Sequence, residues 1–427
     1  MSQTVTVFGA GYVGLVTGVC LASSGHNVTV LDVDEAKVAS LRDGRSPFFE
    51  PGLDEFMRES MDAGRLTFCL VDDLDAISGI AMIAVGTPST ESGSADLRYV
   101  RSAEATIREK AVPGTVVVMK STVPPGTGRG LAAKLEAHGI LYASNPEFLR
   151  EGSAVEDWFH TDRVVIGGEP EATERVSDLY AGVDAPLVLC DVTSAEMVKY
   201  ASNAFLATKI SFINEIARLC DFVGADVEQV AHGVGLDARI GTAFLNAGIG
   251  YGGSCFPKDA RALDFLADMN GYDFQLLRAV IDVNQRQRLL PVRALRDVFG
   301  SLEGRRVAVL GLTFKPNTDD TREAPAREII SMLVAEGADV VTYDPQGVGD
   351  SYPGVAGASS LAEVTRDAHA AIIATEWPEF TQADWGPLVR DMADDPVVFD
   401  GRNCLDRGVI ESAGGRYIGV GRGSSNV

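Results

Sequence analysis

The chain has 427 residues, 46% of them hydrophobic and 23% charged, which is enough for two or three folded domains and unlike a disordered protein. Its formal net charge of −23 argues against nucleic acid as a partner, because binding a phosphate backbone requires a basic face. Its six cysteines stand singly, without the spacing of a structural metal site or the density of a disulfide scaffold, so no metal is expected and a reducing cytoplasm is favoured.

Residues 4–32 predict one βαβ unit: a β-branched strand, a glycine-rich turn, an apolar helix ending at Gly25 and a second strand ending at Asp32. In a GxGxxG turn at this place, the first glycine allows the turn, the second lets the backbone approach a pyrophosphate, and the third lets the helix pack on the strand. The turn here is GAGYVG, made of Gly9, Ala10, Gly11, Tyr12, Val13 and Gly14.

This unit predicts a dinucleotide site. The helix N-terminus would offer free N–H groups to the phosphates, and Asp32 would accept hydrogen bonds from ribose hydroxyls. A carboxylate there repels a 2′-phosphate, so NAD is favoured over NADP; a purely structural turn and FAD are the alternatives. Lys37 is a candidate contact on the adenosine side, with a solvated helix lysine as the simpler interpretation.

The rest of the chain predicts an α/β fold of two Rossmann-like doubly wound domains, joined by a long central helix and a helical dimerisation region. Further strand-like runs at 80–88, 115–122, 139–148 and 163–168 complete a mostly parallel sheet in an NAD-binding domain of residues 1–193. New strands begin at 304–320 and recur at 338–345, 370–377 and 396–403, in a C-terminal domain of residues 301–427. Only the tail GRGSSNV (421–427) is predicted to be disordered.

The central domain, residues 194–300, is predicted to be helical. Apolar residues recur at helical spacing from about Ser194, with no proline or glycine before Gly224, so we expect one helix of ~45 Å capped by Thr193 or Ser194. Such a helix is suited to link domains and to offer a dimer face.

The segment YGGSCFPKD (251–259) places a cysteine where it could be reactive. A lone cysteine more often serves packing, but Gly252 and Gly253 permit close approach of a ligand beside Cys255. If a helix starts near Pro257, its N-terminus and the Lys258 cation would favour the thiolate.

From end to end the chain resembles the UDP-glucose/GDP-mannose dehydrogenase family. The matching motifs, in family order, are GAGYVG (9–14), GRSPFFEPGL (44–53), VGTP (85–88), KSTVPPGT (120–127), NPEFLREG (145–152), KYASNAFLATKISFINEI (199–216), RIGTAFLNAGIGYGGSCFPKD (239–259), GLTFKPNTDDTRE (311–323) and DGRN (400–403). The resemblance implies an NAD-dependent four-electron oxidation of UDP-glucose to UDP-glucuronate, without release of an intermediate. A thiolate would capture the aldehyde as a thiohemiacetal, which a second hydride transfer converts to a thioester that water then cleaves.

The resemblance also implies roles for individual residues. Cys255 would be the nucleophile, and Lys199 and Asn203, four apart on one helix face, would stabilise the oxygen at C6. Asp259 and Glu147 are candidates to activate or orient the water, with Thr122 positioning it. On the cofactor side the family positions are Thr87, Thr122, Glu151, Lys258 and Arg322. Around the sugar nucleotide they are Glu147, Phe148, Leu149, Arg150, Glu151, Lys199, Asn203, Arg239, Phe244, Leu245, Asn246, Ala247, Gly248, Gly252 and Lys315. Arg239 would reach across the interface of a homodimer or higher homo-oligomer.

Composition adds two expectations. Only eight lysines face a large acid excess, which fits an acidic surface suited to a high-salt cytoplasm as well as an ordinary acidic protein. Nothing in the chain resembles an export signal or approaches ~20 unbroken apolar residues, so a soluble protein without a membrane partner is expected.

Other functions stay open. Within the family, GDP-mannose and UDP-N-acetylhexosamines are the alternative substrates; GGSCFPKD favours UDP-glucose, because those branches tend to have leucine after the cysteine or histidine before it. A non-catalytic sensor would be expected to lose the cysteine, lysine or aspartate, and a single-step hydroxyacid dehydrogenase leaves Cys255 unexplained. The number of NADH formed per substrate distinguishes these classes: two for the double oxidation, one for a single-step dehydrogenase and none for a sensor.

Overall fold

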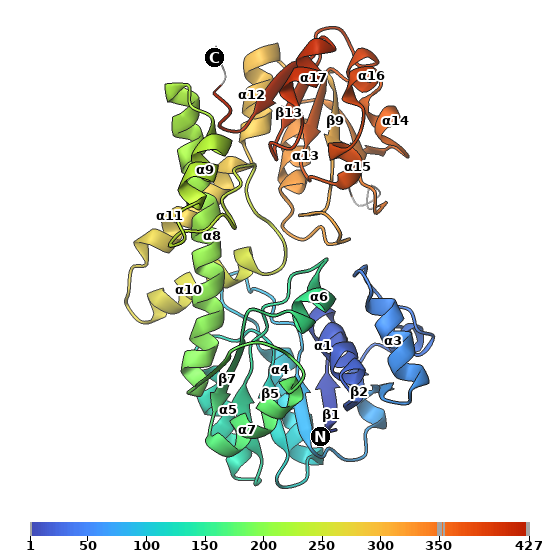
Figure 1. Ribbon diagram of the computed structural model, residues 1–427, viewed down its shortest axis with the longest axis vertical. Coiled ribbons are helices and arrows are strands. Elements are labelled where there is room, and N and C mark those ends of the chain that lie inside the picture. Colours follow the sequence, from blue (N-terminus) through green and yellow to red (C-terminus); the bar gives the residue numbers. More distant parts are fainter. Residues whose placement is uncertain (1, 348–351, 353–354, 424–427) are drawn as a thin grey trace. The chain divides into compact units, whose positions relative to one another are not determined.

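The computed structural model describes residues 2–347, 352 and 355–423, and it divides into two compact units, Met1–Ser202 and Asn203–Val427 (Figure 1). The boundary between the units falls inside one long helix. The domain boundaries expected at 193/194 and 300/301 stay predictions.

The first unit is built on an eight-stranded sheet of order β3-β2-β1-β4-β5-β6-β7-β8. All neighbouring strands are parallel except β6 and β7, as predicted for a mostly parallel sheet. The strands are β1 (Thr4–Phe8), β2 (Asn27–Asp32), β3 (Leu66–Leu70), β4 (Ile80–Ile83), β5 (Val116–Met119), β6 (Leu141–Ser144), β7 (Val164–Gly168) and β8 (Leu187–Cys190).

Both faces of this sheet are buried, because alternate side chains of each strand enter different cores. On β5, Val116 and Val118 belong to one core and Val117 and Met119 to the other. The first core is covered by α1 (Tyr12–Ser23), α3 (Leu53–Asp62), α6 (Ala154–Phe159) and α7 (Pro170–Ser177), and the second by α4 (Arg98–Lys110) and α5 (Thr127–Glu136). Helix α2 (Glu35–Arg42) follows β2.

Helix α8 (Val192–Val223) is the predicted long helix, and its 32 residues contribute to both units. It begins earlier than expected, because Asp191 rather than Thr193 or Ser194 caps it. The Asp191 carboxylate accepts hydrogen bonds from the Ser194 backbone N–H at 3.0 Å and from the Ser194 hydroxyl at 2.5 Å.

The second unit holds a helical segment and a six-stranded parallel sheet of order β11-β10-β9-β12-β13-β14. The strands are β9 (Arg306–Leu310), β10 (Asp339–Tyr343), β11 (Ala356–Gly357), β12 (Ala370–Ile373), β13 (Val397–Asp400) and β14 (Arg416–Gly419). The helices before the sheet are α9 (Val227–Gly235), α10 (Phe256–Met269), α11 (Gln275–Gln287) and α12 (Leu290–Phe299). Those within it are α13 (Pro325–Ala335), α14 (Leu361–Thr365), α15 (Pro378–Thr381), α16 (Trp385–Arg390) and α17 (Arg407–Ser412). The predicted fold class is therefore confirmed.

The C-terminal tail departs from the expected disorder. The Val227 N–H donates to the Gly421 carbonyl at 2.8 Å, and Arg422 pairs with Asp226 at 3.2 Å, so residues 421–423 are held against α9; residues 424–427 of the predicted disordered tail lie outside the described part. Within the described ranges, no helix is both long and apolar enough to cross a membrane.

Candidate active site

The turn between β1 and α1 has the close packing and the open side that a bound pyrophosphate requires. Gly9 has φ +101°, and a Cβ atom on Gly14 would lie only 1.9 Å from the Gly9 carbonyl oxygen. A Cβ on Gly11, at the start of α1, would meet nothing within 4 Å. The glycines at 9 and 14 are thus explained by packing, whereas Gly11 leaves room for a ligand at the helix N-terminus.

Asp32 ends β2 beside this turn and is 8% exposed. Its Oδ2 accepts hydrogen bonds from the Ala10 N–H at 2.9 Å and from Lys37 Nζ at 3.0 Å. Burial alone would raise the pKa of Asp32, but the hydrogen bonds from Ala10 and Lys37 outweigh burial and hold that pKa below its ordinary value. The carboxylate is therefore ionised at neutral pH and available as an acceptor.

Glu50 ties the glycine turn to the loop that carries Glu151. Its buried carboxylate accepts hydrogen bonds from the Gly152 N–H at 2.6 Å, the Ala154 N–H at 2.7 Å and the Tyr12 hydroxyl. Burial, followed by the hydrogen bond to Glu50, raises the pKa of Tyr12, which keeps this hydroxyl a donor. Sequence analysis missed Glu50; the only signal is its place in the FFEPGL motif.

The loops after β4 and β5 are tied to each other at the candidate cofactor positions. The Thr87 hydroxyl donates to the Thr122 carbonyl at 2.9 Å. Just before Thr122, the buried Lys120 donates to Asn145 Oδ1 at 3.1 Å and to the Tyr180 hydroxyl at 2.9 Å. Lys120 was also missed from the sequence.

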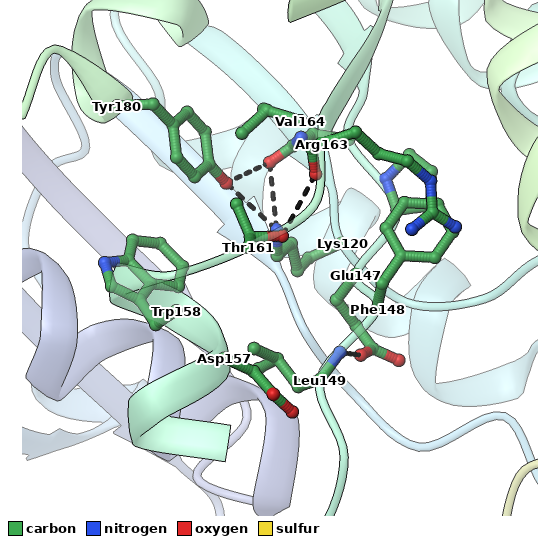
Figure 2. A pocket seen from close by; sticks show the side chains of 12 residues that line it. Lys120, Glu147, Phe148, Leu149, Asp157, Trp158, Thr161, Arg163, Val164 and Tyr180 are labelled. Atoms are coloured by element: carbon green, nitrogen blue, oxygen red, sulfur yellow. Dashed lines mark hydrogen bonds between the residues drawn. The ribbon is translucent and has the colours of Figure 1, made fainter. Parts of the chain in front are cut away.

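A small pocket lies where the loop after β6 passes Lys120 (Figure 2). It is lined by Lys120, Asn145, Pro146, Glu147, Phe148, Leu149, Asp157, Trp158, Thr161, Arg163, Val164 and Tyr180. Figure 2 shows Glu147 turned back toward its own loop, where its Oε2 accepts a 2.6 Å hydrogen bond from the Leu149 N–H. Arg163 stacks on the Phe148 ring, with its guanidinium carbon 3.7 Å from the ring centre.

Glu147 and Lys199 form a buried ion pair in the first unit. Lys199 Nζ lies 3.1 Å from Glu147 Oε1, and the two side chains are 4% and 5% exposed. The ammonium also lies 5.4 Å from the centre of the Phe148 ring. A fixed cation in a desolvated place can stabilise negative charge that develops on a substrate oxygen.

One turn further along α8, Asn203 belongs to a second buried group, in the second unit. Its Nδ2 donates to Asp259 Oδ2 at 2.6 Å, and Lys258 Nζ contacts Asp259 Oδ1 at 2.5 Å. The Asp259 carboxylate is thus held on both oxygens.

Cys255 is the N-cap residue of α10, so the predicted helix start near Pro257 is confirmed. Its carbonyl accepts the Asp259 N–H at 2.8 Å, and its Sγ lies 3.6 Å from the Ser254 hydroxyl. All six cysteines lie in the described ranges, and no two of them form a disulfide. A half-buried thiol at a helix N-terminus, with an ammonium and a carboxylate one turn away, has the surroundings of a nucleophile.

The glycines before Cys255 are closely packed by the chain itself. A Cβ on Gly252 would lie 2.2 Å from the Glu323 carbonyl oxygen, and one on Gly253 would lie 2.8 Å from the Phe314 ring. Packing thus accounts for both glycines, and the close approach of a ligand at this place stays a prediction.

The remaining candidate residues are spread over surface and interior. Leu245, Ala247, Gly248 and Gly252 are buried, Asn246 is exposed, and Phe244 adopts φ +64° with its ring 6.0 Å from that of Phe256. Three arginines pair with neighbouring aspartates: Arg150 with Asp157, Arg239 with Asp237 and Arg322 with Asp320. Lys315 Nζ lies 5.5 Å from the Phe314 ring. In the described part of the chain, no cluster of three His, Cys, Asp or Glu side chains could hold a metal ion.

The fold and these groups define a class of protein: an oxidoreductase with a Rossmann dinucleotide-binding domain and a second doubly wound domain. Residues 3–184 match the NAD binding domain of the UDP-glucose/GDP-mannose dehydrogenase family, residues 193–286 its central domain and residues 308–407 its UDP binding domain. The chain belongs to this family, uses NAD as its cofactor, and carries the domain that binds the UDP part of a sugar nucleotide.

Curated relatives resemble it over their full length. The chain is 46% identical over 433 residues to the UDP-glucose 6-dehydrogenase YwqF of Bacillus subtilis (strain 168), covering 98% of each. It is 44% identical to a UDP-glucose 6-dehydrogenase of Rhizobium meliloti (strain 1021), covering 98% of this chain and 99% of that one.

Solved structures agree with this assignment. A UDP-glucose dehydrogenase from the hyperthermophilic archaeon Pyrobaculum islandicum has a TM-score of 0.90 at 41% identity, covering 99% of this chain and 98% of that one. A UDP-D-ManNAc dehydrogenase from Pyrococcus horikoshii has a TM-score of 0.88 at 30% identity, covering 99% of this chain and all of that one.

Proposed function

We propose that this protein oxidises UDP-glucose to UDP-glucuronate in two hydride transfers to NAD, through a covalent adduct on Cys255. The observation that carries the proposal is the pair of buried groups on helix α8: Lys199 with Glu147, and Asn203 with the Asp259 that follows Cys255 by one turn. An alcohol dehydrogenase that performs a single oxidation needs no nucleophilic thiol such as that of Cys255. The relatives named UDP-glucose 6-dehydrogenase, at 46% and 44% identity, favour UDP-glucose over the UDP-D-ManNAc of the relative at 30% identity.

The residues of the first unit fit NAD. The open backbone at Gly11 would receive the pyrophosphate, and the ionised Asp32 would accept the ribose hydroxyls. When bound, NAD supplies the hydride acceptor for each oxidation. Other residues assigned to this cofactor are Gly9, Tyr12, Val13, Gly14, Lys37, Thr87, Thr122, Glu151, Lys258 and Arg322.

The protein's part in the first oxidation is to hold the C6 oxygen. The Lys199 ammonium and the Asn203 amide would donate to this oxygen, while the hydroxyl proton passes to a carboxylate, Asp259 or Glu147, which returns it to solvent, and C6 loses a hydride. Glu147 keeps the ammonium charged and fixed in a buried place, where an unpaired cation would be costly.

The second stage uses the thiol. The Cys255 thiolate would attack the aldehyde carbon, forming a C–S bond and a hemithioacetal oxygen that Lys199 and Asn203 stabilise. Loss of the second hydride from C6 leaves a thioester on Cys255. Water, activated by Asp259 or Glu147 and positioned by Thr122, adds to the thioester carbon, and the C–S bond breaks to release UDP-glucuronate and restore the thiolate.

Further residues are assigned to the substrate by the family resemblance. The assigned contacts, besides Glu147, Lys199 and Asn203, are Phe148, Leu149, Arg150, Glu151, Arg239, Phe244, Leu245, Asn246, Ala247, Gly248, Gly252 and Lys315. We place the reaction in the cytoplasm.

A homodimer is part of the proposal. On the C-terminal part of α8, Phe205, Phe212 and Leu219 stand seven residues apart, which puts them on one helix face, and they are 66%, 54% and 57% exposed. An apolar stripe of this kind supports a second copy of the chain as its cover.

The test is a substrate panel. Purified protein is given NAD and UDP-glucose, UDP-galactose, UDP-N-acetylhexosamines or GDP-mannose, and NADH and sugar acid are quantified together. We expect UDP-glucose to give the highest kcat/KM and two NADH for each UDP-glucuronate. A ratio of one would identify a single-step dehydrogenase, no NADH a sensor, and preference for GDP-mannose or a UDP-N-acetylhexosamine the alternative branches of the family.

A further inference from the structure

The loop 248–254, which leads into Cys255, has no regular secondary structure, and its backbone is held by side chains of α11. We propose that Asn284, Gln287 and Arg288 are positioning residues that fix this loop and so aim the Cys255 thiol. The inference rests on the proposed role of Cys255 as the nucleophile, and all of these residues belong to the second unit.

Asn284 holds Tyr251 in the way a neighbouring strand would. Its Oδ1 accepts the Tyr251 N–H at 2.8 Å, and its Nδ2 donates to the Tyr251 carbonyl at 3.1 Å. The side chain is 5% exposed, so water cannot replace either bond. The Asn284 amide supplies the donor and the acceptor at once, whereas an ionised carboxylate of the same size could only accept.

Gln287 and Arg288 extend the contact along the same helix face. Gln287, 1% exposed, donates from Nε2 to the Gly248 carbonyl at 2.8 Å. Arg288, 4% exposed, donates to the Tyr251 carbonyl at 3.1 Å and to the Glu323 carbonyl at 3.3 Å, while Glu328 neutralises it. Residues spaced three and four apart face one way on a helix, so α11 presents these three groups together.

Other elements hold further backbone groups of the loop. Arg402 donates to the Gly250 carbonyl at 2.9 Å, and Asn214 Oδ1 accepts the Gly248 N–H at 2.8 Å. The Ile249 N–H donates to the Gly401 carbonyl at 3.0 Å. With so many of its backbone groups bonded, the segment 248–251 has little freedom shortly before the N-cap position of Cys255.

Loss of this restraint should lower the reaction rate more than the stability of the fold. A nucleophile displaced by about 1 Å loses on the order of 100-fold in rate, whereas one buried hydrogen bond is a small part of the stability of such a unit. Removing the donor on Gln287 should therefore change the reactivity of Cys255 in protein that is still folded.

The experiment compares Gln287→Glu with Gln285→Glu, an exposed glutamine on the same helix. The new carboxylate at 287 faces the Gly248 carbonyl without a proton to donate, and it regains a donor when protonated. We measure the rate of Cys255 alkylation by iodoacetamide from about pH 5.5 to pH 9, resolved by peptide mass spectrometry, at a temperature where circular dichroism shows folded protein.

For Gln287→Glu we expect Cys255 to be alkylated at least about 5-fold more slowly than in the wild-type protein above neutral pH, with the ratio returning toward one on acidification. With UDP-glucose and NAD, kcat should fall at least about 10-fold while both KM values stay within about 2-fold. Gln285→Glu should match the wild type at every pH.

If Gln287→Glu does not fold, Asn284→Asp serves instead, because it keeps the acceptor for the Tyr251 N–H and loses the donor to the Tyr251 carbonyl. An alkylation ratio near one across the pH range, in either folded variant, would overturn the positioning role. Alkylation needs no substrate, so its rate can be measured even if the wild-type protein produces no NADH from UDP-glucose. Absence of NADH would contradict the proposed function but not the positioning role.

Discussion

At the scale of single residues, the proposed chemistry depends on charged side chains that are buried. Lys199 and Glu147 are both almost fully buried, and removing one partner of such a pair typically costs ~3–5 kcal/mol because the other charge is left uncompensated. A loss of activity in a Lys199 or Glu147 variant would therefore mix chemistry with stability. Cys255 is a cleaner probe, because a half-buried thiol changed to alanine leaves no unpaired charge.

Cys255→Ala should abolish formation of UDP-glucuronate, lowering its rate by at least about 10³-fold, because no other group in the proposal can hold the aldehyde. Binding of NAD and UDP-glucose, measured by calorimetry, should stay within about 3-fold of the wild type. Cys190→Ala, at a half-buried cysteine ending β8, is the matched control and should keep full activity. Undiminished acid production by Cys255→Ala would refute the assignment.

Glu196, also on α8, makes stability depend on pH. Its carboxylate accepts the Gly126 and Gly128 N–H groups at 2.6 and 2.7 Å at the start of α5, with Tyr142, Arg129 and Asp191 as its ionisable neighbours. Burial outweighs those hydrogen bonds and raises the pKa of Glu196 to about 7. The folded state therefore binds this proton more tightly than the unfolded state does.

A raised carboxyl pKa contributes stability that is complete below the ordinary value near 4.5 and is lost as pH rises through about 7. At about 1.4 kcal/mol per pKa unit, we expect this group to lower the free energy of unfolding by ~2–3 kcal/mol between about pH 5 and pH 8. Urea unfolding across this range should show a flatter profile for Glu196→Gln than for the wild type. Glu215→Gln, at an exposed glutamate of the same helix, should keep the wild-type slope; an equal slope in all three proteins would remove Glu196 as the cause.

Sequence motifs identified residues that act through local geometry and missed those whose partners are remote. The glycine turn and the cap at Cys255 lie within contiguous strand-turn-helix segments, so their form could be predicted. Glu50 bonds to residues about a hundred positions away, at Gly152 and Ala154, and Gln287 to Gly248, 39 positions away. No local pattern encodes such pairs, because the fold alone brings them together.

At the scale of elements, strand burial decided which strands could be predicted. The central strands β4 and β5 are continuous apolar runs buried on both faces, and β1 is β-branched with four of its five residues buried; the sequence predicts all three. The edge strands β3, β8 and β14 have no comparable apolar pattern and were not predicted; in β8 three of four residues are exposed. An edge strand with one partner needs no strong apolar pattern.

In both sheets an aspartate stands at the end of the second strand, but the two aspartates have different partners. Asp344, directly after β10, corresponds in position to Asp32 at the end of β2. Its Oδ2 accepts the Leu312 N–H at 2.7 Å, the Thr313 N–H at 3.2 Å and the Trp377 indole N–H at 3.2 Å. These three donors, one of them the Trp377 side chain, hold the Asp344 carboxylate within its own sheet, so we assign it to the fold rather than to a ribose.

Asp32→Ala should therefore affect NAD binding, whereas Asp344→Ala should affect stability. We expect Asp32→Ala to weaken NAD binding by ~10–100-fold, because the hydrogen bonds from the ribose hydroxyls to a charged acceptor are lost. The same variant should discriminate less strongly against NADP. Asp344→Ala should leave the NAD Kd unchanged and lower the free energy of unfolding by a few kcal/mol, since it orphans buried donors. Titration with NAD and urea unfolding of both variants check this; equal loss of NAD affinity in the two would contradict it.

At the scale of the whole molecule, acidic side chains outnumber basic ones by 60 to 37. Lysine supplies only eight of the basic side chains, of which Lys134 is exposed, Lys120 and Lys199 are buried and the other five are half-buried. Arginines supply the rest, and many of them pair with surface carboxylates, as Arg45 does with Asp43 and Arg58 with Asp54. The net charge of −23 is the acidic excess over all these cations, and mutual repulsion of the carboxylates works against the folded state.

Salt should relieve this repulsion, because the Debye length falls from about 10 Å at 0.1 M to about 3 Å at 1 M. We expect the Tm to rise by several degrees between ~0.1 and ~1 M KCl, and activity with UDP-glucose to be retained at the higher salt, as an acidic surface suited to a saline cytoplasm requires. The double variant Glu109→Lys/Glu136→Lys, at two exposed helix ends, changes the net charge by two units at each site, from −23 to −19, and should show a smaller salt-induced rise in Tm. Sucrose at matched osmolality separates screening from general solvent effects. A fall in Tm or in activity at molar KCl would show instead that the surface ion pairs of this chain outweigh its excess of like charge.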